Sequence, residues 1–155
     1  MIPLLKGITL RDGITFNMVY EIQFDFYYYS VPTGWLTLLR FTKTDGSSGS
    51  SGDRAPSFMM QKNQKKLLIY YELGGKYNQL FRTDDLELNT KMAVNVKQYE
   101  TGGQYKFEIW IDGAKKLEKD NSAPESHEGI RVQSGGPHND PVDGRVENLR
   151  VWPGK

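Results

Sequence analysis

The chain has 155 residues and no cysteine, and its 20 Lys and Arg against 19 Asp and Glu leave a formal net charge of +1. The length fits one domain with a substantial core, and the missing cysteines exclude disulfides, thiolate metal sites and cysteine nucleophiles. The balanced charge shows no excess of basic residues that would indicate binding to nucleic acid. No apolar run approaches the roughly 18 residues of a membrane span. We therefore expect a single domain over residues 1–155 that neither binds nucleic acid nor inserts into a membrane.

The first half of the chain alternates apolar and polar residues with a period of two, which is typical of half-buried strands. Leu4–Leu10 is expected as a first strand, ending at a turn through Asp12-Gly13. Val19–Ser30 is the clearest strand, with one face formed by Tyr20, Ile22, Phe24, Phe26 and Tyr28 and the other carrying Tyr27 and Tyr29. Trp35–Thr42 follows as a strand, and residues 44–56 form a Gly/Ser-rich loop.

The second half continues the pattern and closes on a hairpin. Short strands are predicted at Ser57–Met60, Lys65–Glu72, Tyr77–Arg82 and Lys91–Gln98. Between Tyr105 and Lys119, two strands flank Asp112-Gly113, a pair suited to the positive φ angles of a two-residue turn. A long polar loop and a last strand, GRVENLRVW, complete the chain.

These elements predict an all-β fold, because strands and Gly-rich turns recur and no helical period is seen. We expect an antiparallel β-sandwich of two sheets. Its predicted core residues are Ile22, Phe24, Phe26, Leu36, Leu38, Leu68, Tyr70, Phe107, Ile109, Ile111, Ile130, Val132, Leu149 and Val151.

Several blocks occur in the order seen in laminin G-like, concanavalin A-like domains. YEIQFDF, WLTLLRFT and GDRAP in the first half, and the "IDG" hairpin with the terminal GRVENLRV strand in the second, resemble that family. The chain departs from it where Met92 or a neighbour replaces a common Trp, and in lacking the frequent C-terminal disulfide. The resemblance implies a jelly-roll sandwich that acts as a non-catalytic module for glycans or protein partners, often with calcium at a loop rim.

Two loops could supply the oxygen ligands that calcium needs. Asp53 lies in the Gly/Ser-rich loop, and Asn139, Asp140 and Asp143 lie near the end of the chain. The alternative is that these residues only shape turns, as Asp and Asn commonly do. Calcium is therefore a possible cofactor.

An aromatic face could bind sugars. Tyr27, Tyr29 and Trp110 lie opposite the apolar faces of their strands, beside Glu21, Gln23, Asp25 and Glu108. Aromatic rings take the C–H faces of a sugar, while amides and carboxylates bind its hydroxyls. Arg54 and His138 are further candidate ligand-binding residues, although Arg54 could instead clamp its loop through a carboxylate.

Catalysis is less well supported by the residues. Glu21 and Asp25 are spaced by four along a strand, roughly 13 Å apart, which is too far for the carboxylate pair of a retaining glycosidase. YELGGKYNQ resembles a strand of jelly-roll alginate lyases, in which Tyr77 would donate the proton. The other lyase motifs are missing, and His127 and His138 are expected in polar loops, so no catalytic residue is predicted for the preferred reading.

The sequence thus favours a lectin-like or adhesive module with a glycan or an extracellular protein as its partner and with calcium as a candidate cofactor. A polysaccharide lyase and a protein-interaction or structural domain remain alternatives. We expect an extracellular location, although MIPLLKGITL lacks the features of a secretory signal peptide. The oligomeric state and the identity of the ligand do not follow from these residues.

Overall fold

The computed structural model describes residues 4, 8–44, 50–135 and 139–154. Within them the secondary structure consists of strands and turns. The strands, in chain order, are β1 (Ile8–Phe16), β2 (Tyr20–Tyr28), β3 (Leu36–Thr42), β4 (Ser57–Met60), β5 (Leu67–Leu73), β6 (Lys76–Arg82), β7 (Met92–Thr101), β8 (Gln104–Ile111), β9 (Ala114–Asn121), β10 (His127–Ser134), β11 (Asp140–Pro141) and β12 (Gly144–Trp152). No helix of the described residues is long and apolar enough to cross a membrane.

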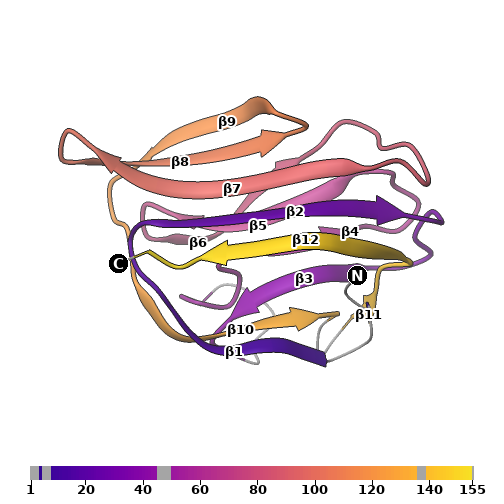
Figure 1. The fold of residues 1–155 in the computed structure, drawn as a ribbon, viewed down its shortest axis with the longest axis horizontal. Coiled ribbons are helices and arrows are strands. Elements are labelled where there is room, and N and C mark those ends of the chain that lie inside the picture. Colours follow the sequence, from indigo (N-terminus) through magenta and orange to yellow (C-terminus); the bar gives the residue numbers. More distant parts are fainter. Residues whose placement is uncertain (1–3, 5–7, 45–49, 136–138, 155) are drawn as a thin grey trace.

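The strands form two sheets that pack face to face (Figure 1). One sheet has the order β1-β10-β3-β4-β5-β6, with β11 paired to β3, and the other has the order β12-β2-β7-β8-β9. The neighbours run antiparallel, apart from the short parallel pairing of β11 with β3. This arrangement confirms the predicted all-β fold of two sheets in a sandwich.

Aromatic side chains from both sheets meet in the core. The Phe24 ring of β2 meets the Phe58 ring of β4 edge-on at 4.8 Å between centroids, and the Tyr71 ring of β5 stacks on Phe107 of β8 at 4.6 Å. Phe58 and Phe107 are fully buried. Because each pair joins one sheet to the other, these contacts hold the two layers in register.

The predicted strands are largely confirmed, and Ser57–Met60 and the terminal Gly144–Trp152 have the observed bounds. The polar loop predicted between the hairpin and the last strand is wrong, because β10 and β11 form there. The alternation of buried Ile130 and Val132 is the signal for β10. The first strand does not end at Asp12-Gly13: β1 continues through it, with Gly13 at a φ of 68° and irregular pairing to β10.

The prediction of which β5 residues face the main core is wrong. Leu68 and Tyr70 are buried, but they pack with Met59 and Leu80 in a small separate cluster, whereas Leu67 and Ile69 belong to the main core. Strand alternation explains the difference, since neighbouring residues lie on opposite faces of a sheet. Three other predicted core residues only pack, partly buried, at the margin of the core: Leu36, Leu149 and Val151.

Candidate functional site

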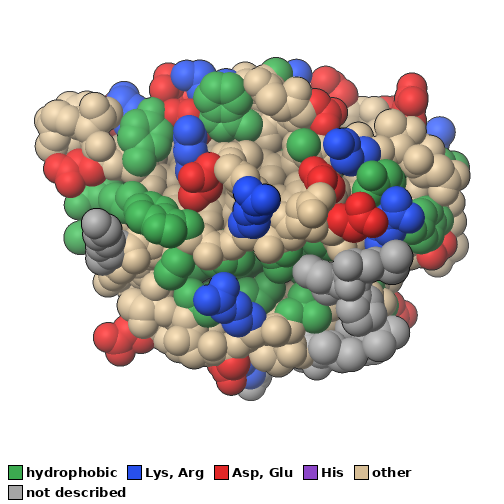
Figure 2. Space-filling view, in the orientation of Figure 1, with side chains coloured by type: hydrophobic (Ala, Val, Ile, Leu, Met, Phe, Trp, Pro, Cys, Tyr) green, Lys and Arg blue, Asp and Glu red, His purple; other side chains and the backbone are tan. Residues whose placement is uncertain are grey.

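The outer face of the five-stranded sheet carries a row of polar and aromatic side chains. Arg150 of β12 lies opposite Gln23 of β2, Gln23 opposite Asn95 of β7, and Asn95 opposite Trp110 of β8. Residues that are directly opposite in antiparallel strands have side chains on the same face, within contact distance. Four strands thus contribute to one continuous surface, seen from the front in Figure 2 with hydrophobic, basic and acidic groups interspersed.

A groove runs beside this row, with a volume of about 530 Å³. Ala93 and Gly113 line it and offer little or no side chain, which leaves room between Trp110 on one side and Asn148 and Arg150 on the other. Gly113 is there because the β8–β9 hairpin turns through Asp112 and Gly113, whose φ angles are 50° and 78° as predicted. The volume lies within the usual range of small-molecule sites.

The Trp110 indole is held in a fixed orientation. Its Nε1 donates to Oε1 of Glu108 at 2.7 Å, and the Tyr99 hydroxyl donates to the other oxygen of the same carboxylate. The Lys97 ammonium lies 5.4 Å from the Trp110 ring centroid, a cation–π contact. Because its polar edge is already bonded, the indole presents an ordered apolar surface to the groove.

Glu108 is buried and remains ionised. Burial alone would raise the pKa of its carboxyl, but the hydrogen bonds from Tyr99 and Trp110 and the charge of Lys97 together hold that pKa below 4.5. The same Glu108 hydrogen bond raises the pKa of the Tyr99 hydroxyl to about 12. Tyr99 therefore stays protonated, and a donor to Glu108, at neutral pH.

Polar groups ring the rest of the groove. Asn148, at a φ of 55°, sits at an irregularity in the pairing of β12 with β2 and donates to Oδ2 of Asp25 at 2.8 Å. Asn95 donates through Nδ2 to Glu21 at 2.6 Å. Arg150 is exposed and forms no ion pair with any acid among the described residues. The groove combines one ring face with an amide, a carboxylate and a guanidinium, a set suited to a polyhydroxylated ligand.

The predicted ligand-binding residues do not all lie in this groove. Trp110 lines it, whereas Tyr27 is on the same face with the Arg145 guanidinium 4.1 Å from its ring centroid. Tyr29 is exposed, one residue past the end of β2. Arg54 donates to Asn78 at 2.8 Å and covers the Tyr70 ring at 4.1 Å. The predicted ion pair with a carboxylate is not found among the described residues, although the Asp53 charge acts on Arg54. His138 lies outside the described residues.

The predicted metal ligands lie in two separate regions. The Asp53 side chain is buried in the β3–β4 loop and accepts from the Thr44 hydroxyl and from the Ser50 amide, the latter at 3.0 Å. Asp143 accepts from the Ser30 hydroxyl at 2.7 Å. Asp140 is exposed in β11, directly after the half-buried Asn139. Asp53 thus organises its own loop, and these contacts leave the calcium prediction untested.

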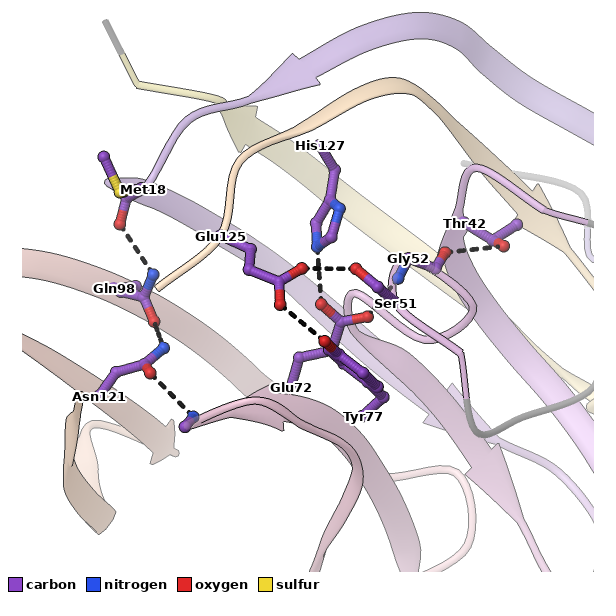
Figure 3. Close-up of polar contacts among 11 residues, drawn as sticks. Met18, Thr42, Ser51, Gly52, Glu72, Tyr77, Gln98, Asn121, Glu125 and His127 are labelled. Atoms are coloured by element: carbon purple, nitrogen blue, oxygen red, sulfur yellow. Dashed lines mark hydrogen bonds and ion pairs between the residues drawn. The ribbon is translucent and has the colours of Figure 1, made fainter. Parts of the chain in front are cut away.

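A polar network, which the sequence analysis did not predict, closes the end of the sandwich where the chain passes from β9 to β10 (Figures 1 and 3). His127 bonds through Nε2 to Glu72 at 2.6 Å, and Tyr77 donates to Glu125 at 2.9 Å. The prediction that His127 lies in a polar loop is wrong, because this residue begins β10 and is 5% exposed.

The network encloses a hollow of only about 30 Å³. That space holds about two water molecules and is far too small for a sugar ring. Tyr77, the residue of the lyase alternative, is bonded within this network, and its pKa is raised by the hydrogen bond to Glu125. The closed geometry does not favour a polysaccharide lyase.

Most of the residues that line the groove were not predicted from the sequence. The alternation in β2 indicated Gln23 and Asp25, but Ala93, Asn95, Asn148 and Arg150 come from strands whose partners are set only by the sheet order. The alternation of Met92, Val94 and Val96 was a usable signal for the outward direction of Asn95. No pattern in the sequence indicated that the strands would be ordered β12-β2-β7-β8 in the sheet.

Several solved structures have a similar fold. The chain is similar to sheep galectin-11 in complex with glycerol, with a TM-score of 0.57, 10% identity and coverage of 98% of this chain and 100% of the other. It is similar to the CBM40 of Ruminococcus gnavus IT-sialidase bound to α2,3-sialyllactose, with a TM-score of 0.60, 15% identity and coverage of 96% and 90%.

A third similarity is to Trypanosoma rangeli sialidase, with a TM-score of 0.62 and 15% identity over 87% of this chain and 20% of the sialidase. The matched part is thus a small portion of that enzyme. No protein-family model and no curated sequence matches the chain. At these identities the similarities show the fold alone, an antiparallel β-sandwich of two sheets.

Proposed function

We propose that the protein is a non-catalytic carbohydrate-binding module whose ligand occupies the groove on the outer face of the five-stranded sheet. The observation that carries this proposal is the fixed Trp110 indole beside the hollow above Ala93 and Gly113. A pyranose ring has an apolar C–H face and polar edges, and an aromatic wall with a few polar groups is complementary to both. The similarity of the fold to the CBM40 of Ruminococcus gnavus IT-sialidase, which is bound to α2,3-sialyllactose, supports the same proposal.

The groove is long enough for more than one sugar unit. Adjacent strands lie about 4.8 Å apart, so the backbones that carry Trp110 and Arg150, three strands apart, are separated by about 14 Å. A sugar stacked on Trp110 therefore leaves room for a second unit within reach of Asn148 and Arg150. An oligosaccharide running across the strands is the expected ligand.

The test is a glycan array probed with the wild-type protein and with Trp110→Ala. We expect the wild type to bind a defined set of oligosaccharides, and the variant to lose at least about tenfold in affinity, or 1.4 kcal/mol, because the stacking surface is gone. Trp35→Ala is the matched control, since Trp35 is an exposed tryptophan outside the groove. Equal loss of affinity in both variants would reject the groove as the site.

The same glycan array also tests the prediction that calcium assists binding. Binding in calcium and in EDTA tests the proposed calcium assistance by Asp53, Asn139, Asp140 and Asp143. We also propose the laminin G-like subtype and an extracellular location, both on the resemblance of the sequence blocks and on the glycan ligand. An array without any bound glycan would instead favour a protein partner or a structural role.

A further inference from the structure

Three side chains from separate segments converge at the closed end of the sandwich. Glu72 lies near the end of β5, Glu125 in the β9–β10 connection, and His127 at the start of β10. One ligand atom from each lies within 4.8 Å of the other two. Figure 3 shows both carboxylates and the imidazole pointing toward one another.

The two carboxylates of this cluster are not ion-paired with a basic side chain. Among the described residues no Lys or Arg forms an ion pair with Glu72 or Glu125, although Lys43 acts on Glu125 from a greater distance. Two half-buried carboxylates this close repel each other unless a cation lies between them.

The carboxylates are already oriented by neutral donors. Glu125 accepts from the Ser51 hydroxyl at 2.5 Å and from Tyr77 at 2.9 Å, while Glu72 accepts from the Gly52 amide and from His127. Each carboxylate oxygen therefore accepts one hydrogen bond and keeps another lone pair. Outer hydrogen bonds of this kind fix the ligands of metal sites.

The imidazole offers one nitrogen to the cluster. His127 is 5% exposed, and Nε2 is the nitrogen that faces Glu72, whereas Nδ1 points to another side of the ring and is buried without a hydrogen-bond partner. A proton carried on Nδ1 would leave the Nε2 lone pair directed at the carboxylates. The hollow of about 30 Å³ that Glu72, Glu125 and His127 line has room for a small ion there.

We propose that Glu72, Glu125 and His127 bind a divalent transition-metal ion, with Zn²⁺ as the best fit. Zinc takes imidazole nitrogen and carboxylate oxygen at about 2.0–2.2 Å, so the ligand atoms of a tetrahedral site lie about 3.3–3.6 Å apart. The three ligand atoms here lie within 4.8 Å of one another, and the ion would replace the 2.6 Å hydrogen bond between His127 and Glu72. Calcium prefers oxygen ligands alone, which makes this site different from the predicted calcium site. The bound ion fastens the Ser51-Gly52 segment of the β3–β4 loop to the end of the sandwich.

The test is calorimetric titration of the EDTA-treated, tag-free protein with Zn²⁺, together with thermal unfolding. We expect binding of one ion per chain and a rise in Tm, because an ion that binds only the folded state stabilises it. His127→Gln and Glu125→Gln each remove one ligand and should weaken binding at least about tenfold. Glu128→Gln is the matched control, since the exposed Glu128 neighbours the site but is not part of it.

Substitution with Co²⁺ gives a second readout. We expect visible ligand-field absorption in the wild type that is absent in His127→Gln. If that variant does not fold, Glu125→Gln decides the question by the same two measurements. No heat and no Tm shift in the wild type, or Zn²⁺ binding that is unchanged in the ligand variants, would overturn the proposal and leave only a hydrogen-bonded network. Glycan binding at Trp110 is scored separately, so the two proposals fail independently.

Discussion

The two outer faces of the sandwich differ in how they use aromatic residues. On the five-stranded sheet, Trp110 borders an open groove and its indole nitrogen is tied to the buried Glu108. On the seven-stranded sheet, Tyr70 is 9% exposed and lies under the Arg54 guanidinium, packed with Leu68 and Met59. The first ring is presented to solvent and the second is covered.

This difference shows what decides whether an aromatic residue can bind a ligand. Both side chains point away from the main core. What separates them is the size of their neighbours: Ala93 and Gly113 leave a hollow beside Trp110, whereas Met59, Leu68 and Leu80 fill the space beside Tyr70. We therefore propose that the outer face of the five-stranded sheet binds the ligand, whereas the outer face of the seven-stranded sheet contributes to stability.

The largest expected effect comes from the core that both faces share. Phe107→Ala should lower the free energy of unfolding by about 3–5 kcal/mol, because it deletes a fully buried ring and leaves a cavity under Tyr71. Urea unfolding measures the loss. An unchanged stability would mean that β8 does not place Phe107 between the sheets.

The covered face gives the next largest effect. Tyr70→Ala should lower the free energy of unfolding by about 2–3 kcal/mol, since it exposes the apolar cluster and removes the contact with Arg54. Glycan affinity measured by calorimetry should stay at the wild-type value. A folded Tyr70→Ala variant that loses glycan affinity would show that the ligand binds the seven-stranded sheet, which would contradict the proposed site.

A larger side chain in the groove beside Trp110 should weaken glycan binding and leave the stability almost unchanged, the opposite of Tyr70→Ala. Ala93→Leu places a larger side chain in the groove beside Trp110 and should weaken glycan binding at least about tenfold. The free energy of unfolding should change by less than about 0.5 kcal/mol, because the side chain lies on the outer surface. Wild-type affinity in this variant would contradict the proposed ligand position.

The smallest expected effect concerns the support of Trp110. The folded-state pKa of Glu108 lies below 4.5, so its contribution to stability is complete above about pH 4.5 and is lost as the pH falls through the lowered value. In Glu108→Gln this part of the acid destabilisation should be missing. Urea unfolding at about pH 6 and about pH 3 compares the two proteins, and identical losses would show that Glu108 does not titrate in this way.

The sequence predicted the strands better than the surfaces that they build. Alternation in Tyr20–Tyr28 identified both the core residues and the outward Tyr27, because a period of two is a local property. It did not reveal that Arg145 covers Tyr27, nor that Arg150, Gln23, Asn95 and Trp110 form one row, since both depend on which strands pair.

The prediction of which β5 residues face the main core was wrong for a related reason. Leu67–Tyr71 is apolar throughout, so the pattern of two is lost in a strand that is buried on both faces. His127 was likewise assigned to a loop because its partner, Glu72, is 55 residues away in the chain. Contacts of this range follow from the topology and not from any local pattern.

The most direct test of the central claim uses the three tryptophans of the chain, Trp35, Trp110 and Trp152, as internal reporters. Their indole N–H resonances are followed by NMR during titration with the glycan that binds most tightly on the array, after assignment by single Trp→Phe variants. The account predicts a large shift of the Trp110 resonance and small or no shifts of the other two. A Trp110 resonance that stays in place while the glycan saturates the protein would contradict it.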